Sequence, residues 1–142
     1  MINKEFKETL LNFFRKKDRF AANSDIEVVD VKEGWAVAQV KIQQKHLNGV
    51  NIAHGGILFT LADVAFGLAA NSYGRIAVTL NADISFFNPA TEGMLVIAEA
   101  EELSLRYTIA SYLVSIKDEK GTLLASMKCQ AYRKGEMSEL EE

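Results

Sequence analysis

The segment from Ile57 to Ala70 constrains the fold of this chain more than any other part. It contains only two polar side chains, those of Thr60 and Asp63. A helix that is apolar on nearly every side must be buried, so the rest of the chain has to surround it. No Lys, Arg or His lies at a helical neighbour position of Asp63, and an unpaired buried carboxylate is costly. We therefore expect Asp63 either to be hydrogen-bonded by another part of the fold or to take part in chemistry.

The length and composition are those of one domain with a substantial core. The chain has 142 residues, of which 49% are hydrophobic and 25% charged, and its net charge is −3. This charge argues against a nucleic-acid surface, and no apolar run approaches the ~20 residues that span a membrane. The N-terminus lacks a signal-peptide core, and the single cysteine, Cys129, excludes an internal disulfide framework. We therefore expect a cytoplasmic protein without nucleic-acid or membrane partners.

The residues before the apolar segment predict a helix, two strands and a loop. Residues 3–19 have apolar side chains at helical spacing with charged ones between them, which indicates an amphipathic packing helix. Residues 26–31 and 35–42 are expected to form strands. A polar loop over residues 43–53 then leads into the buried helix over residues 57–70.

After residue 75 the sequence changes to long segments rich in Val, Ile, Thr, Tyr and Phe, which are typical of strands. There are four of them: Arg75–Phe87, Gly93–Leu103, Arg106–Lys117 and Thr122–Arg133. The breaks between them are short, which implies antiparallel neighbours. A sheet with one apolar face can wrap a buried helix, so we predict an α+β fold with a curved antiparallel sheet. Residues 1–133 would form this single domain, and residues 134–142 an acidic, mobile tail.

The glycine pair Gly55-Gly56 directly precedes the apolar helix. Glycine allows a ligand to approach the backbone, and the first N–H groups of a helix lack partners within the helix. Such donors can hold a carbonyl oxygen as negative charge develops on it. Asp63 lies roughly 9 to 12 Å further along the helix axis, too far for both groups to grip one carbonyl easily. A second copy of the chain would solve this, so the spacing predicts a dimeric active site.

The loop, the glycine pair, the acidic residue and a later strand keep a recognisable spacing. The residues are Asn48 to Gly56, then Leu61-Ala62-Asp63, then Asp83 to Ala90, which read as a strand leading into a Pro-Ala turn. Together they resemble the hotdog-fold acyl-CoA thioesterases of the phenylacetate-degradation type. The resemblance covers roughly residues 20–133. It implies a hotdog fold, hydrolysis of an acyl-CoA thioester to free acid and coenzyme A, and a homotetramer built as a dimer of dimers.

The resemblance also implies roles for individual residues. Asp63 would activate water or attack the thioester carbonyl, and the N–H of Gly55 would polarise that carbonyl. Asn48 and His54 would shape the pocket and help place the thioester or the acid, while Thr79 would help hold the water beside Asp63. Asn48, His54 and Gly55 would come from the partner subunit. Coenzyme A is part of the substrate, so no separate cofactor and no metal is expected.

The chain departs from the family pattern in two loops. Asn51 stands where many relatives have Gly, but Asn tolerates a positive φ better than most residues, so the turn can survive. Leu105-Arg106-Tyr107-Thr108 stands where relatives often have Gly followed by basic residues and Thr. The missing Gly leaves the coenzyme A contacts undefined, with Arg106 as a candidate for a phosphate contact.

Two other functions stay open. Hotdog dehydratases act on hydroxyacyl thioesters with a His and an acidic residue, but they typically carry a proline near the His loop, which is absent here. A non-catalytic acyl-CoA binding or sensing module would normally carry an effector segment, and the residues before the first strand are too few for one. Asp63 itself would be a core carboxylate if it bonded only to backbone or to Thr60. The sequence defines neither the acyl group nor whether Asp63 acts as base or nucleophile.

Overall fold

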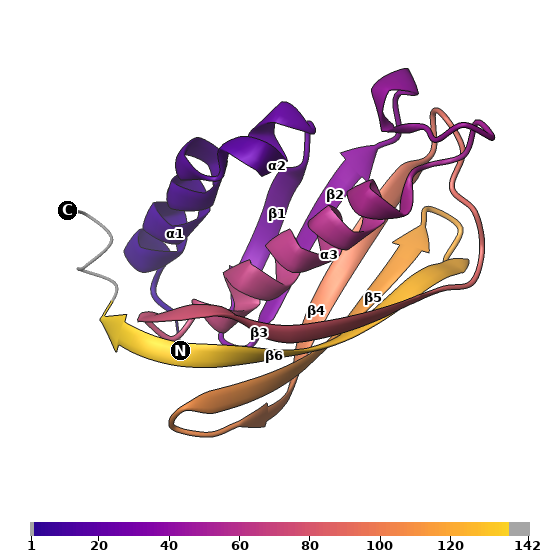
Figure 1. Cartoon of the computed structure of the whole chain (residues 1–142). Helices are drawn as coiled ribbons and strands as arrows, with labels where there is room; N and C mark the ends of the chain where they lie inside the picture. Colours follow the sequence, from indigo (N-terminus) through magenta and orange to yellow (C-terminus); the bar gives the residue numbers. More distant parts are fainter. Residues whose placement is uncertain (1, 137–142) are drawn as a thin grey trace.

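One long helix lies in the hollow of a six-stranded antiparallel sheet (Figure 1). The computed structural model describes residues 2–136. The helix, α3 (Gly55–Ala70), has ten buried residues among its 16, and the predicted α+β architecture is confirmed. It begins two residues earlier than predicted because His54 caps it. Within residues 2–136, no helix is long and apolar enough to cross a lipid bilayer.

The sheet has β3 at one edge and β1 at the other. Its strands are β1 (Glu27–Lys32), β2 (Trp35–Lys41), β3 (Arg75–Phe86), β4 (Leu95–Leu105), β5 (Ile109–Asp118) and β6 (Leu123–Glu136). They lie in the order β1-β2-β4-β5-β6-β3, and every neighbouring pair is antiparallel. Alternate side chains of the central strands are fully buried against α3, as in the run Ala36, Ala38 and Val40 of β2.

The expectation that short breaks join neighbouring strands is wrong for β3 and β4. β3 pairs with β6, and β4 pairs with β2. After β3 the chain follows β6 as far as Asn88, whose N–H donates to the Leu124 carbonyl (3.2 Å). It then crosses to β2, where Gly93 N–H donates to the Ile42 carbonyl (2.8 Å). Pro89 begins this crossover, and it has no N–H with which to extend a strand ladder.

Two strand boundaries also differ from the predicted ones. The break expected near Ser104 is an irregularity within the strand, where the register shifts between Glu102 and Ser104, and β4 continues to Leu105. At the other end of the chain, β6 extends to Glu136 rather than stopping at residue 133. The remainder of the predicted tail, residues 137–142, lies outside the described residues.

The N-terminal helix predicted over residues 3–19 is divided in two, α1 (Lys4–Lys17) and α2 (Arg19–Asn23). Asp18 separates them and caps α2 through its side chain. α1 packs beside β1 and reaches α3 (Figure 1), where the ring of Phe14 lies over Gly67. A Cβ atom at Gly67 would be 3.5 Å from this ring, so the small residue allows close packing of the two helices.

Candidate active site

Asp63 is hydrogen-bonded by another part of the fold. The Oγ1 of Thr79, on β3, donates to Oδ1 of Asp63 over 3.0 Å. The local alternative, Thr60, donates to the Gly56 carbonyl instead (2.7 Å). Thr79 is exposed and Asp63 is half-buried, because β3 is the edge strand and nothing in the described chain covers it. The structure therefore brings Asp63 and Thr79 together at a place that solvent can reach.

The surroundings of Asp63 favour its protonated form. Burial raises the pKa of the carboxyl group above its ordinary value of 3.8, because the ionised form loses hydration. The hydrogen bond from Thr79 acts in the opposite direction and lowers the pKa, and the negative charge of Asp18 raises it further. The net shift is upward. A carboxylate with a raised pKa accepts a proton from water more readily, which suits general-base catalysis near neutral pH.

The first turn of α3 leaves the backbone N–H of Gly55 free. Gly56 N–H donates to Nδ1 of His54 (2.9 Å), and Ile57 N–H donates to the His54 carbonyl (3.0 Å). Gly55 N–H has no acceptor within residues 2–136. It lies at the positive end of the helix, where an unpaired N–H attracts a carbonyl oxygen that gains negative charge. Of the two glycines, Gly55 is thus the one that can serve as a donor to a ligand.

Each glycine of the pair lies against a ring. A Cβ atom at Gly55 would lie 3.2 Å from Cζ of Phe86, and one at Gly56 would lie 3.0 Å from Nδ1 of His54. Neither glycine has a positive φ, so what distinguishes both positions is the close approach of a ring rather than the backbone conformation. The sequence indicates Phe86 only as a core or interface residue. Its contact with Gly55 is set by the fold, since β3 returns along α3 to bring the two residues together.

A groove of about 430 Å³ opens beside Gly55. Most of its walls are apolar and come from the loop before α3, from α3 itself and from the chain after β3: Ile52, Ala53, Leu58, Phe86, Phe87, Pro89 and Ala90. Asn48 also lines it, and its Oδ1 accepts N–H groups of Val50 and Ile52 (3.0 and 3.3 Å). The side-chain NH₂ group of Asn48 is then available to a ligand. Such a groove suits an apolar molecule with a carbonyl group.

The predicted residues form two separate groups within one chain. Asp63 and Thr79 make the carboxylate half-site, and Asn48, His54 and Gly55 make the amide half-site. Asp63 lies eight positions after Gly55 in the helix, a rise of about 12 Å along its axis. The groove beside Gly55 contains neither Asp63 nor Thr79.

Arg106 belongs to neither half-site and lies in the turn between β4 and β5. Its side chain is exposed, and no partner for it is found within residues 2–136. Arg75 stacks on the neighbouring Tyr107, with 4.5 Å between the guanidinium carbon and the ring centroid. Arg133 donates to the Arg106 carbonyl (2.8 Å). The sequence does not indicate Arg75 and Arg133, because they come from β3 and β6 and meet this turn only in the fold.

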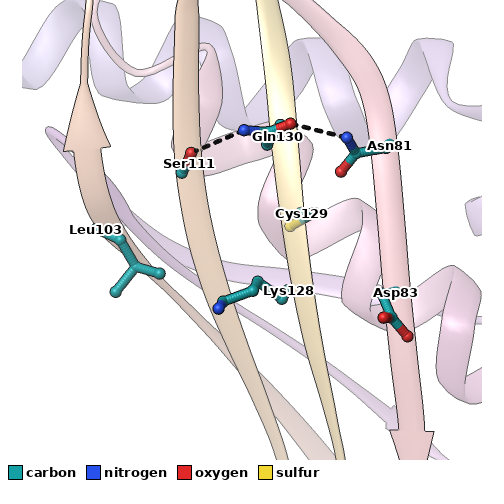
Figure 2. Close-up of a pocket in the computed structure, with 7 residues that line it drawn as sticks. All are labelled: Asn81, Asp83, Leu103, Ser111, Lys128, Cys129 and Gln130. Carbon is teal, nitrogen blue, oxygen red and sulfur yellow. Dashed lines mark hydrogen bonds between the residues drawn. The ribbon is translucent and has the colours of Figure 1, made fainter.

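A second hollow, of about 500 Å³, lies on the face of the sheet away from α3 (Figure 2). It is lined by Asn81, Asp83, Leu103, Ser111, Lys128, Cys129 and Gln130. The amide of Gln130 links two strands here, because it accepts from Asn81 (2.7 Å) and donates to Ser111 (3.4 Å). Cys129 is fully buried, and burial raises the pKa of its thiol to about 12, so it is a poor nucleophile. None of the predicted site residues lies in this hollow.

Comparison with known proteins assigns this chain to a family. The sequence model of the thioesterase superfamily matches residues 50–125, which include α3, β3 and Asp63. This chain belongs to the thioesterase superfamily. It is 36% identical to a putative esterase of Archaeoglobus fulgidus, over 91% of this chain and 84% of that protein. It is 31% identical to the acyl-coenzyme A thioesterase PaaI of Escherichia coli, over 84% of this chain and 86% of that protein.

The fold of this thioesterase agrees with that of a solved relative. The structure of the Escherichia coli PaaI protein from the phenylacetic acid degradation operon matches it with a TM-score of 0.87 and 29% identity. The match covers 90% of this chain and 93% of that chain. The predicted hotdog fold of the PaaI type is confirmed, and the chain is a thioester hydrolase.

Proposed function

We propose that this thioesterase hydrolyses an acyl-CoA to a free acid and coenzyme A, with Asp63 as its catalytic carboxylate. The observation that carries the proposal is the position of Asp63, which interrupts an otherwise buried apolar helix, has a raised pKa and is held by Thr79. The Escherichia coli relative named acyl-coenzyme A thioesterase supports the substrate class.

The two half-sites supply what thioester hydrolysis needs. As a base, Asp63 takes a proton from water while the water oxygen attacks the carbonyl carbon. The carbonyl oxygen becomes negative, and the N–H of Gly55 stabilises it. The C–S bond then breaks, the sulfur of coenzyme A leaves with the bonding electrons and takes up the proton that Asp63 held, and the free acid remains. As a nucleophile, Asp63 would instead form an acyl anhydride that water hydrolyses in a second step.

The active site is proposed to be shared by two copies of the chain. Gly55 and Asp63 of one chain are about 12 Å apart along the helix axis, so they do not meet at one carbonyl. β3 offers a self-pairing edge, because it is 12 residues long and presents the exposed apolar side chains of Val78 and Leu80. Thr79 lies between them, so pairing through β3 would place the carboxylate half-site at a twofold interface with two equal sites. Two such dimers would then associate as the proposed tetramer.

A charge at the β3 edge is expected to prevent this assembly. Leu80→Lys places an ammonium group where a second β3 would pair, and we expect a halved mass by light scattering and loss of turnover, with unchanged far-UV circular dichroism. Val29→Lys is the matched control, since Val29 is an exposed apolar residue on β1, at the opposite edge. An unaltered mass for Leu80→Lys would contradict pairing through β3.

The turn between β4 and β5 is proposed to contact the phosphates of coenzyme A. Arg106 is exposed, and Arg75 and Arg133 add two guanidinium groups to the same end of the sheet. Guanidinium groups suit phosphate oxygens. Tyr107 is 81% exposed beside them and offers a flat ring to the nucleotide.

Arg106→Ala is therefore expected to raise KM for an acyl-CoA several-fold, roughly the loss of one charge-assisted contact, with kcat nearly unchanged. An N-acetylcysteamine thioester of the same acid has no phosphate groups and provides the control. Its KM should not respond to the substitution. Equal losses on both substrates would show that Arg106 supports the fold rather than the nucleotide.

Removing the hydroxyl of Thr79 tests its bond to Asp63. Thr79→Val keeps the shape of the side chain, and we expect kcat to fall roughly tenfold or more. The acid limb of the kcat–pH profile should also move to higher pH, because the Thr79 hydrogen bond lowers the pKa of Asp63 and the base must be ionised. Thr79→Ser retains a hydroxyl, so its kcat and the acid limb of its kcat–pH profile should match those of the wild type. An unmoved acid limb in Thr79→Val would show that the bond does not act on the base.

Release of free thiol from a panel of acyl-CoAs tests the proposed function itself. Aryl-acetyl, medium-chain and short-chain esters are compared, with the free acid measured in parallel. Hydrolysis predicts equal amounts of thiol and acid, and the panel ranks the acyl groups. Binding without thiol release would identify a binding module, and loss of water from a hydroxyacyl ester would identify a dehydratase. Either result would contradict the proposal.

A further inference from the structure

His54 forms the N-cap of α3. Its backbone is extended (φ −60°, ψ 139°), as is usual for a capping residue, and its Nδ1 accepts the N–H of Gly56 over 2.9 Å. Its carbonyl accepts the N–H of Ile57. The side chain and the carbonyl of His54 thus use the two N–H groups that follow Gly55, and Gly55 N–H is left for a ligand.

The cap determines which ring nitrogen of His54 carries the hydrogen. A backbone N–H can donate only to a ring nitrogen that carries no proton, so Nδ1 is unprotonated and the ring hydrogen is on Nε2. Nδ1 could accept a proton during the reaction only by giving up its bond to Gly56. This geometry separates His54 from the role of general base.

The second glycine of the pair is explained by the same ring. A Cβ atom at Gly56 would lie 3.0 Å from Nδ1 and 3.5 Å from Cε1 of His54. The ring can therefore approach the first turn closely enough to cap it only because residue 56 has no side chain. Gly56 and His54 act as one unit, and this unit is separate from the contact between Gly55 and Phe86.

The preceding loop holds His54 from the other side. His54 N–H donates to the carbonyl of His46 over 2.8 Å. His46 is itself buried: its Nδ1 accepts the N–H of Gln43 (2.9 Å), and its Nε2 lies 2.8 Å from the Ser24 carbonyl, to which it donates. Gly55 therefore follows a residue that is anchored by its backbone N–H, its carbonyl and its ring.

We infer that His54 is a positioning residue, which caps α3 so that the N–H of Gly55 faces the substrate carbonyl, and that it takes no part in proton transfer. The inference rests on the proposed function, in which Gly55 N–H is the donor to that carbonyl. The imidazole of His54 then serves to hold the backbone of the first turn of α3, and Asp63 is the group that transfers the proton.

Two substitutions of His54 separate capping from proton transfer. The hydroxyl of Ser can accept the N–H of Gly56, but Ser has no ring nitrogen, whereas Ala has neither. We expect His54→Ala to lower kcat about tenfold with KM nearly unchanged, and His54→Ser to stay within about threefold of wild type. If His54 transferred a proton, His54→Ser would be as impaired as His54→Ala, and the inference would be overturned.

A double substitution tests the contact between the ring and residue 56. Gly56→Ala should lower kcat in the wild type, because the new Cβ displaces the imidazole. In the His54→Ser background the ring is absent, so the same change should have a smaller effect on kcat. The two effects are then non-additive, as expected for groups in contact. If the losses of kcat caused by Gly56→Ala and His54→Ser were additive, the two residues would not act through their contact.

A remote cap provides the control for general loss of stability. Asn3 caps α1 through the same type of bond, with its Oδ1 accepting the N–H of Phe6 (2.8 Å). Asn3→Ala should lower the melting temperature and leave kcat unchanged. A loss of kcat equal to that of His54→Ala would overturn the inference. Wild-type protein that releases no thiol would instead show that the proposed function fails.

Discussion

Asp63→Asn is expected to lower kcat roughly 10²- to 10⁴-fold, the range for loss of a catalytic base, while the protein still folds and assembles. Asn has nearly the same shape, and its Oδ1 can still accept the hydrogen bond from Thr79. The substitution should therefore leave the folded structure unchanged. The measurement is thiol release from the best acyl-CoA of the panel, with the mass of the assembly determined in parallel.

Asp83→Asn is the matched control, because Asp83 is an exposed carboxylate on β3, the strand that also carries Thr79. Its turnover should equal that of the wild type. Unchanged turnover in Asp63→Asn would show that another group performs the chemistry, and equal losses in both variants would show that the strand, rather than the carboxylate at position 63, is required.

Asp63→Asn is also expected to raise the stability of the folded protein at neutral pH. Burial raises the pKa of Asp63 above 3.8, so the folded state binds this proton more tightly than the unfolded state. The stability from this group is present below pH 3.8 and is lost as pH rises through the raised pKa. Asn has no charge to desolvate. Asp63→Asn should therefore melt at a higher temperature than wild type at pH 7, and the difference should shrink as the pH is lowered. An equal melting temperature at pH 7 would contradict a desolvated carboxylate.

Gly55→Pro is expected to lower kcat about 10²- to 10³-fold with little effect on KM, since it removes the N–H that is proposed to stabilise the oxyanion. Proline is favoured at the first position of a helix, so α3 should still form. The residue before a proline must be extended, and His54 already is. Thiol release over a range of substrate concentrations separates kcat from KM.

Gly55→Ala is the control for the added atoms. It places the same Cβ 3.2 Å from Cζ of Phe86 but keeps the N–H. Because Phe86 is half exposed, its ring can move aside, so we expect most of the activity to remain. If Ala and Pro reduce kcat equally, residue 55 matters for the space it leaves and the N–H is not the donor.

The apolar segment around Asp63 was sufficient to predict the architecture but not the order of the strands. A helix without a polar face requires a sheet around it, and this holds whatever the strand order is. Pairing depends on where each connection crosses the sheet, and the short break at Pro89 reads like a hairpin although it is a crossover. Thr79 shows the same limit, because only the family resemblance, and no local spacing, placed it beside Asp63. Among the helix residues Thr60 was the nearest hydroxyl, while the hydroxyl that bonds Asp63 comes from the far edge strand.

Local features of the amide half-site were easier to predict than its long-range contacts. Asn51 does adopt a positive φ (62°), as its substitution for Gly suggested, because this is a property of one residue. The cap between His54 and Gly56 is also local, since it spans only two residues, although His is not among the usual N-cap residues. The ring of Phe86 over Gly55 could not, since it depends on the path of β3 along α3.

A mixture of two inactive variants tests most directly whether one active site uses Asp63 of one copy and Gly55 of another. Asp63→Asn and Gly55→Pro each disable both sites of their own dimer, but a mixed dimer contains one intact site. After the two variants are refolded together, thiol release should recover to roughly a quarter of the wild-type rate, the share expected for random pairing in a twofold dimer. A mixture no more active than either variant alone, beside an active wild type, would show that Gly55 and Asp63 do not meet across two chains.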